Sequence, residues 1–228
     1  KLIAAYGDEA LVEEWLPKLA SGEWGATICI SEVDAGLEAG RMRTMATPLG
    51  DGRWSITGEK CWISFGDHDL TPRIGHCILA RTPDAAPGGA GISLFLVPGG
   101  GEQGDTVAVR RIEYKMGLHG SPTCALGFEG AVGVMLGAEG RGLSQMFVMI
   151  TQMRIAVGVM GLGIASASTD LALKYAEERI QGSGLVIAEH ADVQRQLLEM
   201  VSRVEVLRGL VFAVANIAEI SRDDAQAQ

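Results

Sequence analysis

The hydrophobic pattern of this chain changes its period once, and that change restricts the fold more than any other sequence feature. From residue 23 to about residue 128, short runs alternate apolar and polar residues between turns rich in glycine and proline. Such runs are typical of short strands in a β-barrel or sandwich. From residue 143 onward the apolar residues recur at helical spacing. Strands followed by helices predict the α+β fold class rather than alternating α/β units.

Three segments follow from this pattern. Residues 1–22 are predicted to be helical and to end an N-terminal helical domain. Residues 23–132 form a predicted β-barrel-like middle domain. Residues 133–228 carry two predicted long helices, about 143–181 and from His190 onward, with apolar spacing suited to a helical bundle. Two helices cannot bury so much apolar surface, so we expect more helices or another subunit to cover it, and we expect the chain to be a fragment.

The strand candidates are short and evenly spaced. Asp51-Gly52 lies between two of them and predicts a β-hairpin. The predicted strands are 26–30, 41–47, 54–57, 61–64, 77–81, 92–97, 107–112 and 123–128.

Charge and cysteine content narrow the function classes. The chain has 28 acidic and 19 basic residues, a net charge of −9, which argues against nucleic acid or an anionic membrane as its main partner. The cysteines show no CxxC spacing, so we expect buried free thiols in a reducing compartment and a cytoplasmic location; a disulfide or a metal site is the alternative. They are Cys29, Cys61, Cys77 and Cys124.

Three further patterns resemble a membrane span, a dinucleotide-binding motif and a metal site, but the residues favour another interpretation of each. The apolar run 143–167 is interrupted by polar residues including Arg154, so it predicts a buried helix and no integral membrane span. Gly161-Leu162-Gly163 lies inside a helical run and falls short of a dinucleotide-binding fingerprint. Gly66-Asp67-His68-Asp69 is a local cluster without a third ligand group, so we expect no metal site.

Two segments at predicted strand ends combine a hydroxyl with an aromatic ring. They are Ile30-Ser31-Glu32 and Gly58-Glu59-Lys60-Cys61-Trp62-Ile63-Ser64. A Trp among apolar residues can stack on a flat heterocycle while a neighbouring hydroxyl bonds the edge of that heterocycle; the alternative is an ordinary strand with a buried Trp. Together with Lys115-Met116-Gly117-Leu118-His119-Gly120-Ser121-Pro122-Thr123, these segments resemble the acyl-CoA dehydrogenase family. The resemblance is greatest to its larger bacterial fatty acyl-CoA and 3-methylmercaptopropionyl-CoA dehydrogenase-like members.

The resemblance implies a flavoprotein oxidoreductase of fatty acid metabolism that uses FAD. It would remove the α-proton of an acyl-CoA thioester and pass the β-hydrogen to flavin N5 as hydride. It also implies acyl-CoA as substrate, an electron-transfer flavoprotein as electron acceptor, and a homodimer or homotetramer. Two alternatives remain: another flavin enzyme on this fold, such as an acyl-CoA oxidase or a monooxygenase, and a non-catalytic truncated protein.

The resemblance also implies the site residues. The cofactor-binding residues would be Ile28, Ile30, Ser31, Gly36, Trp62, Ile63, Ser64, Arg179 and Gln181. The substrate-binding residues would be Leu37 and Arg154. An ion pair within the bundle is the alternative for Arg154, and the negative end of a helix dipole is the alternative for Arg179.

The sequence departs from the family at functional positions. Val33, Leu37 and Glu38 replace family residues, and Leu37 replaces a hydroxyl that helps to hold the flavin pyrophosphate and CoA. Leu cannot donate that hydrogen bond. The catalytic Glu of most members would lie beyond residue 228, and the other position used in the family is Met153 here. We therefore expect no catalytic base within residues 1–228.

Overall fold

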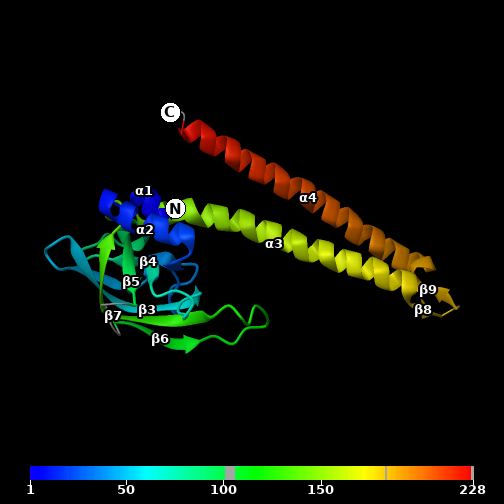
Figure 1. Ribbon diagram of the computed structural model, residues 1–228, viewed down its shortest axis with the longest axis horizontal. Coiled ribbons are helices and arrows are strands. Elements are labelled where there is room, and N and C mark those ends of the chain that lie inside the picture. The colour runs from blue at the N-terminus through cyan, green and yellow to red at the C-terminus, as the bar shows by residue number, and fades with distance from the viewer. Residues whose placement is uncertain (101–105, 183, 227–228) are drawn as a thin grey trace. The chain divides into compact units, whose positions relative to one another are not determined.

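A computed structural model describes residues 1–100, 106–182 and 184–226 of the chain, which forms two compact units, residues 1–149 and 150–228. The first unit holds two helices and a sheet (Figure 1). Its helices are α1 (Leu2–Tyr6) and α2 (Glu9–Ser21), with short 3₁₀ turns η1 (Ala39–Arg41) and η2 (Gly88–Gly91). Its strands are β1 (Gly25–Cys29), β2 (Met45–Pro48), β3 (Arg53–Ser64), β4 (Ile74–Arg81), β5 (Ile92–Gly99), β6 (Val107–Ile112) and β7 (Thr123–Met135).

The strands of the described residues pair in a closed circuit. Strand β4 bonds to β2 on one side and to β5 on the other, and β3 and β7 complete the ring. Strand β1 runs parallel to β4, and β6 is antiparallel to β7. The predicted barrel-like sheet and the hairpin at Asp51-Gly52 are confirmed.

The barrel interior is mainly aliphatic, with Phe95 and Phe128 as aromatic members. Its centre is formed by buried side chains from all strands except β6: Cys29, Ala46, Ile56, Ile63, Ile78, Ala80, Phe95, Val97, Cys124, Leu126, Phe128 and Ala131. Helix α2 covers the outside of β4, where buried Trp15 reaches Gly75. Both faces of β4 are therefore buried, and its sequence is correspondingly apolar.

Several element boundaries differ from the sequence prediction. The predicted strand 41–47 is a strand only from Met45, because residues 39–41 form the 3₁₀ turn η1. The helix predicted over the first 20 residues is two helices, because Gly7 ends α1 and the Asp8 carboxylate caps α2 by accepting from the Leu11 N–H at 2.9 Å. The predicted strands 54–57 and 61–64 are one strand, β3, which continues through Gly58. Strand β7 runs to Met135 and so passes the predicted domain boundary at 132.

The four cysteines are free and buried, as predicted. Burial raises the pKa of the Cys29 and Cys77 thiols to about 12, so both are protonated and unreactive at neutral pH.

The second unit contains most of α3 (Gly142–Glu178), the strand pair β8 (Ile180–Gln181) and β9 (Leu185–Val186), the turn η4 (Ile187–Glu189) and α4 (Ala191–Gln226). The two long helices contact each other where Arg208 donates to the Ser166 hydroxyl at 3.5 Å. Helix α3 was predicted to be buried, but only 6% of its most apolar segment is buried in this chain. Of the described helices, α3 is the one with the length and apolar composition to span a membrane. The predicted absence of a membrane span stays a prediction.

Candidate functional site

Strand β1 directs alternate residues into and out of the barrel. Thr27 and Cys29 are buried inside, whereas Ile28 and the following Ile30 are partly exposed. The inward Thr27 hydroxyl lies 2.9 Å from the Nδ1 atom of buried His76 on β4, so each of these buried polar groups has a hydrogen-bond partner. The outer side of β1 therefore offers an apolar strip that is open to a ligand.

Trp62 lies at a β-bulge in β3. Lys60 pairs with Leu126 of β7, and Ile63 pairs with Cys124, so Cys61 and Trp62 together oppose one residue of β7. Trp62 has a φ of +62°, a rare value for a bulky residue, and its side chain is 61% exposed. The alternative of an ordinary strand with a buried Trp therefore does not hold, and the ring is available to a ligand.

The residues that follow Trp62 divide between core and surface. The Ile63 side chain is 2% exposed and belongs to the barrel core, so only its backbone could contact a cofactor. Ser64 is exposed at the end of β3. A hydroxyl is thus accessible on the same strand end as the exposed ring.

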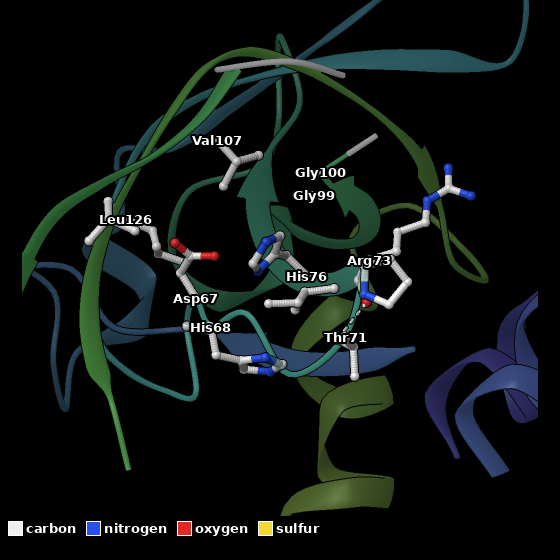
Figure 2. A pocket seen from close by; sticks show the side chains of 13 residues that line it. Asp67, His68, Thr71, Arg73, His76, Gly99, Gly100, Val107 and Leu126 are labelled. Atoms are coloured by element: carbon white, nitrogen blue, oxygen red, sulfur yellow. Dashed lines mark hydrogen bonds between the residues drawn. The ribbon is translucent and has the colours of Figure 1, made fainter. Parts of the chain in front are cut away.

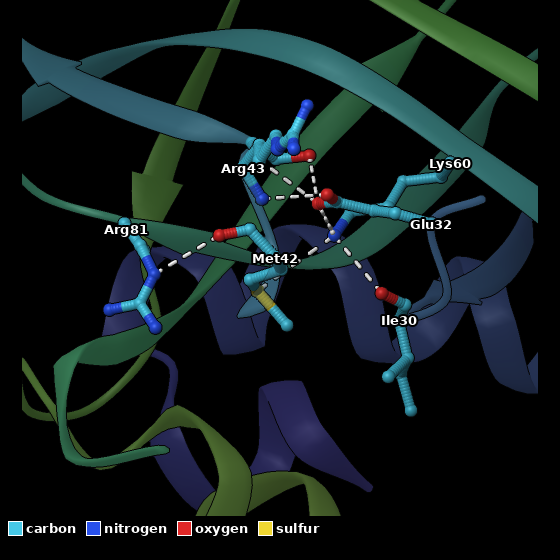
Figure 3. A network of polar contacts seen from close by, with 7 residues as sticks. Ile30, Glu32, Met42, Arg43, Lys60 and Arg81 are labelled. Atoms are coloured by element: carbon cyan, nitrogen blue, oxygen red, sulfur yellow. Dashed lines mark hydrogen bonds and ion pairs between the residues drawn. The ribbon is translucent and has the colours of Figure 1, made fainter. Parts of the chain in front are cut away.

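The two predicted segments lie side by side. The Cys61 N–H donates to the Ser31 carbonyl at 2.9 Å, and the Lys60 ammonium donates to the Ile30 carbonyl at 3.1 Å (Figure 3). The bulge of β3 thus takes its hydrogen bonds from the segment after β1. The two segments are far apart in sequence, and the fold brings them together at Cys61 and Ser31.

A buried ion pair lies beneath this junction. Lys60 Nζ is 2.9 Å from Glu32 Oε1; the Lys60 side chain is fully buried and that of Glu32 is 9% exposed. Glu32 also accepts from the N–H groups of Arg43 and Thr44, at 2.6 and 3.1 Å, and from the Thr44 hydroxyl at 2.6 Å. Every charged atom of the pair has a partner, as a buried pair requires.

Burial and pairing change the pKa values of both Glu32 and Lys60. Burial by itself would raise the pKa of Glu32, but the Lys60 charge and the hydrogen bonds from Thr44 and Arg43 outweigh it and lower that pKa. Burial lowers the pKa of Lys60, and the Glu32 charge opposes that shift. The sequence interpretation did not single out either residue, although both lie inside the two segments that it quoted.

The loop after Glu32 carries Gly36 and Leu37. Glu32 and Ala35 exchange backbone hydrogen bonds, which closes a tight turn. Gly36 is not in the left-handed region, and a Cβ added there would meet open space, so the turn itself does not require glycine. Leu37 is fully exposed. This loop leaves room for a ligand but offers no side-chain donor at position 37.

Three predicted site residues lie in the second unit. Arg154 is an exposed residue in the middle of α3, and Arg179 and Gln181 are exposed where α3 ends and β8 begins. The Gln181 carbonyl lies 3.1 Å from His190 Nε2, and the Arg179 carbonyl accepts from the Ile187 N–H at 2.8 Å. The backbone around Arg179 is therefore fixed while its guanidinium group faces outward.

A hollow lined by barrel residues and by the loop after β3 was not predicted. It has a volume of about 90 Å³, and Figure 2 shows Asp67 and His76 directed into it. Burial lowers the pKa of His76 to about 4, so the imidazole is neutral at physiological pH. Among the described residues no three His, Cys, Asp or Glu side chains are grouped so that they could hold a metal ion.

Comparisons with known proteins agree with this architecture. Residues 27–131 match the family described as "Acyl-CoA dehydrogenase, middle domain", and residues 140–228 match "Acyl-CoA dehydrogenase, C-terminal domain". The chain is 39% identical to the 3-methylmercaptopropionyl-CoA dehydrogenase of Ruegeria pomeroyi over 97% of its own length and 41% of that relative. The chain thus spans less than half of this relative.

Solved structures extend the likeness to three dimensions. Butyryl-CoA dehydrogenase from Megasphaera elsdenii matches with a TM-score of 0.82 and 29% identity, over 93% of this chain and 54% of that one. A chain from a study of the electron transferring flavoprotein of Acidaminococcus fermentans and flavin-based electron bifurcation matches with a TM-score of 0.82 and 28% identity, over 95% and 55%.

Proposed function

Because this chain belongs to the acyl-CoA dehydrogenase family, we propose that the protein containing it binds FAD and oxidises an acyl-CoA thioester between Cα and Cβ. The exposed Trp62 ring at the β3 bulge carries this proposal, together with the bond from the N–H of neighbouring Cys61 to the Ser31 carbonyl. An aromatic face next to an accessible hydroxyl suits a flat, polar-edged heterocycle.

The residues present fit FAD. Ile28 and Ile30 offer partly exposed apolar surface, and Trp62 offers an exposed ring. Ser31 and Ser64 offer hydroxyl groups at accessible positions. Isoalloxazine has an apolar end and a hydrogen-bonding end, so it needs both kinds of surface. We propose that these residues hold the flavin ring and that Arg179 of a second subunit serves a phosphate group, for which its paired donors are suited.

The chemistry would divide between cofactor and protein. Bound FAD supplies the acceptor for hydride. The chain's own residues would orient the ring through Trp62, hydrogen-bond its edge through Ser31 and Ser64, and keep its apolar end dry through Ile28 and Ile30. We propose that the carboxylate that removes the α-proton lies outside residues 1–228.

Substrate contacts would be weaker than in relatives at one point. Leu37 is fully exposed and cannot donate to a phosphate or to CoA. Arg154 remains the proposed substrate contact from α3, since it supplies a cation in an apolar helix. We propose butyryl-CoA and 3-methylmercaptopropionyl-CoA as candidate substrates, because two relatives are named for these thioesters.

We also propose the electron acceptor, the assembly and the location of the protein. An electron-transfer flavoprotein would reoxidise the flavin; the similarity to a chain studied with such a flavoprotein supports this. A homodimer or homotetramer would cover the exposed apolar faces of α3 and α4. The buried free thiols support a cytoplasmic location.

Anaerobic titration tests this function. The full-length protein containing this chain, loaded with FAD, is mixed with butyryl-CoA or 3-methylmercaptopropionyl-CoA under argon, and the visible absorbance of oxidised flavin is followed. We expect bleaching by at least one thioester and slow return of colour in air, since fast return would indicate an oxidase.

The matched variant is Trp62→Ala. We expect about tenfold weaker FAD binding, because the stacking surface is lost. FAD affinity equal to that of the parent would contradict the placement of the ring, and bound FAD that no acyl-CoA reduces would contradict the proposed activity.

A further inference from the structure

We propose that Glu32 and Lys60 are positioning residues for the cofactor: their ion pair holds the bulge of β3 against residues 30–32, so that Trp62 and Ser31 are preorganised to receive the flavin. This inference rests on the function proposed above. It concerns residues that do not themselves reach the exposed surface on which the ring would lie.

The bulge needs support that β7 does not give. Between the pairs Lys60–Leu126 and Ile63–Cys124, strand β3 has one residue more than β7, so the regular ladder is interrupted there. The Cys61 N–H bonds instead to the Ser31 carbonyl, and Lys60 Nζ bonds to the Ile30 carbonyl. The position of Trp62 therefore depends on where residues 30–32 lie.

The ion pair fixes that position from both sides. Lys60 extends from β3 and reaches one carbonyl and one carboxylate of the other segment. Glu32 in turn is held by the backbone of residues 43–44 and by the Thr44 hydroxyl (Figure 3). Gly58 allows this close approach, since a Cβ there would lie 2.8 Å from the Cα of Thr44. The cluster thus joins three chain segments at one point.

Burial makes the arrangement specific. A fully buried ammonium group has lost its hydration, and it is satisfied only if the carboxylate and the carbonyl remain at hydrogen-bond distance. An apolar pair would fill the same volume without fixing the Ile30 carbonyl. A charged pair at this place therefore selects one arrangement of the segments, even where it adds little to stability.

The ion pair maintains the backbone conformation of Trp62. Its positive φ is unfavourable for a bulky side chain and persists only where the surroundings enforce it. If residues 30–32 shift, the bulge can relax and the ring can turn away from Ser31. Loss of the pair should then reduce flavin binding more than it reduces folding stability.

The test compares FAD affinity with apoprotein stability in the full-length protein. The double variant Glu32→Gln/Lys60→Met keeps the volume of both side chains and one acceptor oxygen for residues 43–44, but it removes both charges, the second acceptor oxygen and the bond to Ile30. We expect an apoprotein melting temperature above those of the two single variants and close to the parent's, with FAD binding about tenfold weaker or more. The absorption bands of the remaining bound flavin should also shift, because the ring no longer lies in the parent environment.

A milder variant decides the question if the double variant does not fold. Thr44→Val removes one hydrogen bond to Glu32 without changing side-chain size, and we expect about threefold weaker FAD binding. The matched control is Glu59→Gln/Arg110→Met, which removes the exposed ion pair between Arg110 and the residue next to Lys60, together with the exposed Arg110–Glu129 pair, and its FAD affinity should equal the parent's.

The outcomes separate this inference from the proposed function. Parent-like FAD affinity in both the double variant and Thr44→Val overturns the positioning role, as does an equal loss in the Glu59/Arg110 control. A parent protein that binds no FAD contradicts the proposed function itself.

Discussion

Trp62 combines two properties that stability does not favour, an exposed ring and a left-handed backbone. A large side chain at positive φ costs about 1–2 kcal/mol, and an exposed indole recovers little of that cost through burial. Strain of this kind concentrates at binding and catalytic sites, where the surrounding structure maintains it. The Glu32–Lys60 pair supplies such surroundings in this protein.

His76 is the second residue whose environment departs from its ordinary chemistry. Its ring is buried in the barrel wall, bonds to the Thr27 hydroxyl and faces the hollow that also receives Asp67. Since burial disfavours the charged form, the imidazole is neutral in the folded protein.

We predict an acid-dependent loss of stability from His76. Its pKa is about 4 in the folded state against 6.5 when unfolded, so the unfolded chain binds more protons between these values. The free energy of unfolding contributed by this residue therefore falls as pH decreases from 6.5 to 4, by on the order of 3 kcal/mol in total. Urea denaturation at several pH values should show a shallower pH dependence for His76→Gln than for the parent.

The control is His119→Gln, at an exposed position in the loop between β6 and β7. It should keep the pH dependence of the parent. A His76→Gln variant with the parent's slope between pH 6.5 and 4 would contradict a neutral buried imidazole.

At the scale of elements, β3 shows why alternation in a sequence can mislead. Its burial pattern breaks at the bulge, where Lys60 and Cys61 are both buried in succession. The sequence therefore indicated two short strands where one long strand exists. The charged Lys60 in the middle of this strand has its partner 28 residues away.

We predict that the packing of α2 on β4 depends on Gly75. A Cβ at this position would lie 2.5 Å from the Trp15 ring, which is buried against the strand. Gly75→Ala should therefore lower the free energy of unfolding by about 1–3 kcal/mol, because either the helix or the ring must move. Urea denaturation of the two proteins measures this difference.

Gly36→Ala is the matched control. The added methyl group meets open space there, and the residue has no positive φ, so stability without cofactor should be unchanged. Equal stability of Gly75→Ala and the parent would show that α2 does not press on β4 as described.

At the scale of the whole molecule, the two units differ in how well they bury their apolar residues. The first has a closed barrel core, whereas α3 and α4 of the second unit expose many large apolar side chains. Examples are Val157, Met160, Ile164, Leu171, Leu210, Phe212 and Ile217. Exposed apolar surface on this scale marks an interface.

We therefore predict that residues 1–228, produced alone, self-associate through the long helices. Phe212→Glu places a charge in the apolar face of α4 and should weaken self-association by more than about tenfold, as judged by sedimentation equilibrium. Gln194→Glu adds the same charge at an exposed polar position of α4 and should have no effect. A monomeric parent at high concentration would contradict this prediction.

The sequence by itself determined the fold class, the order of the elements, the hairpin at Asp51-Gly52 and the two segments that line the proposed site. Each of these depends on local periodicity, turn chemistry or a contiguous motif, so neighbouring residues are enough to reveal it. Only the tertiary structure decided that Lys60 pairs with Glu32, that Cys61 bonds to Ser31 and that Trp62 adopts a positive φ. The two contacts join residues distant in sequence. A buried charge requires a partner, but the local sequence does not specify which distant residue provides it.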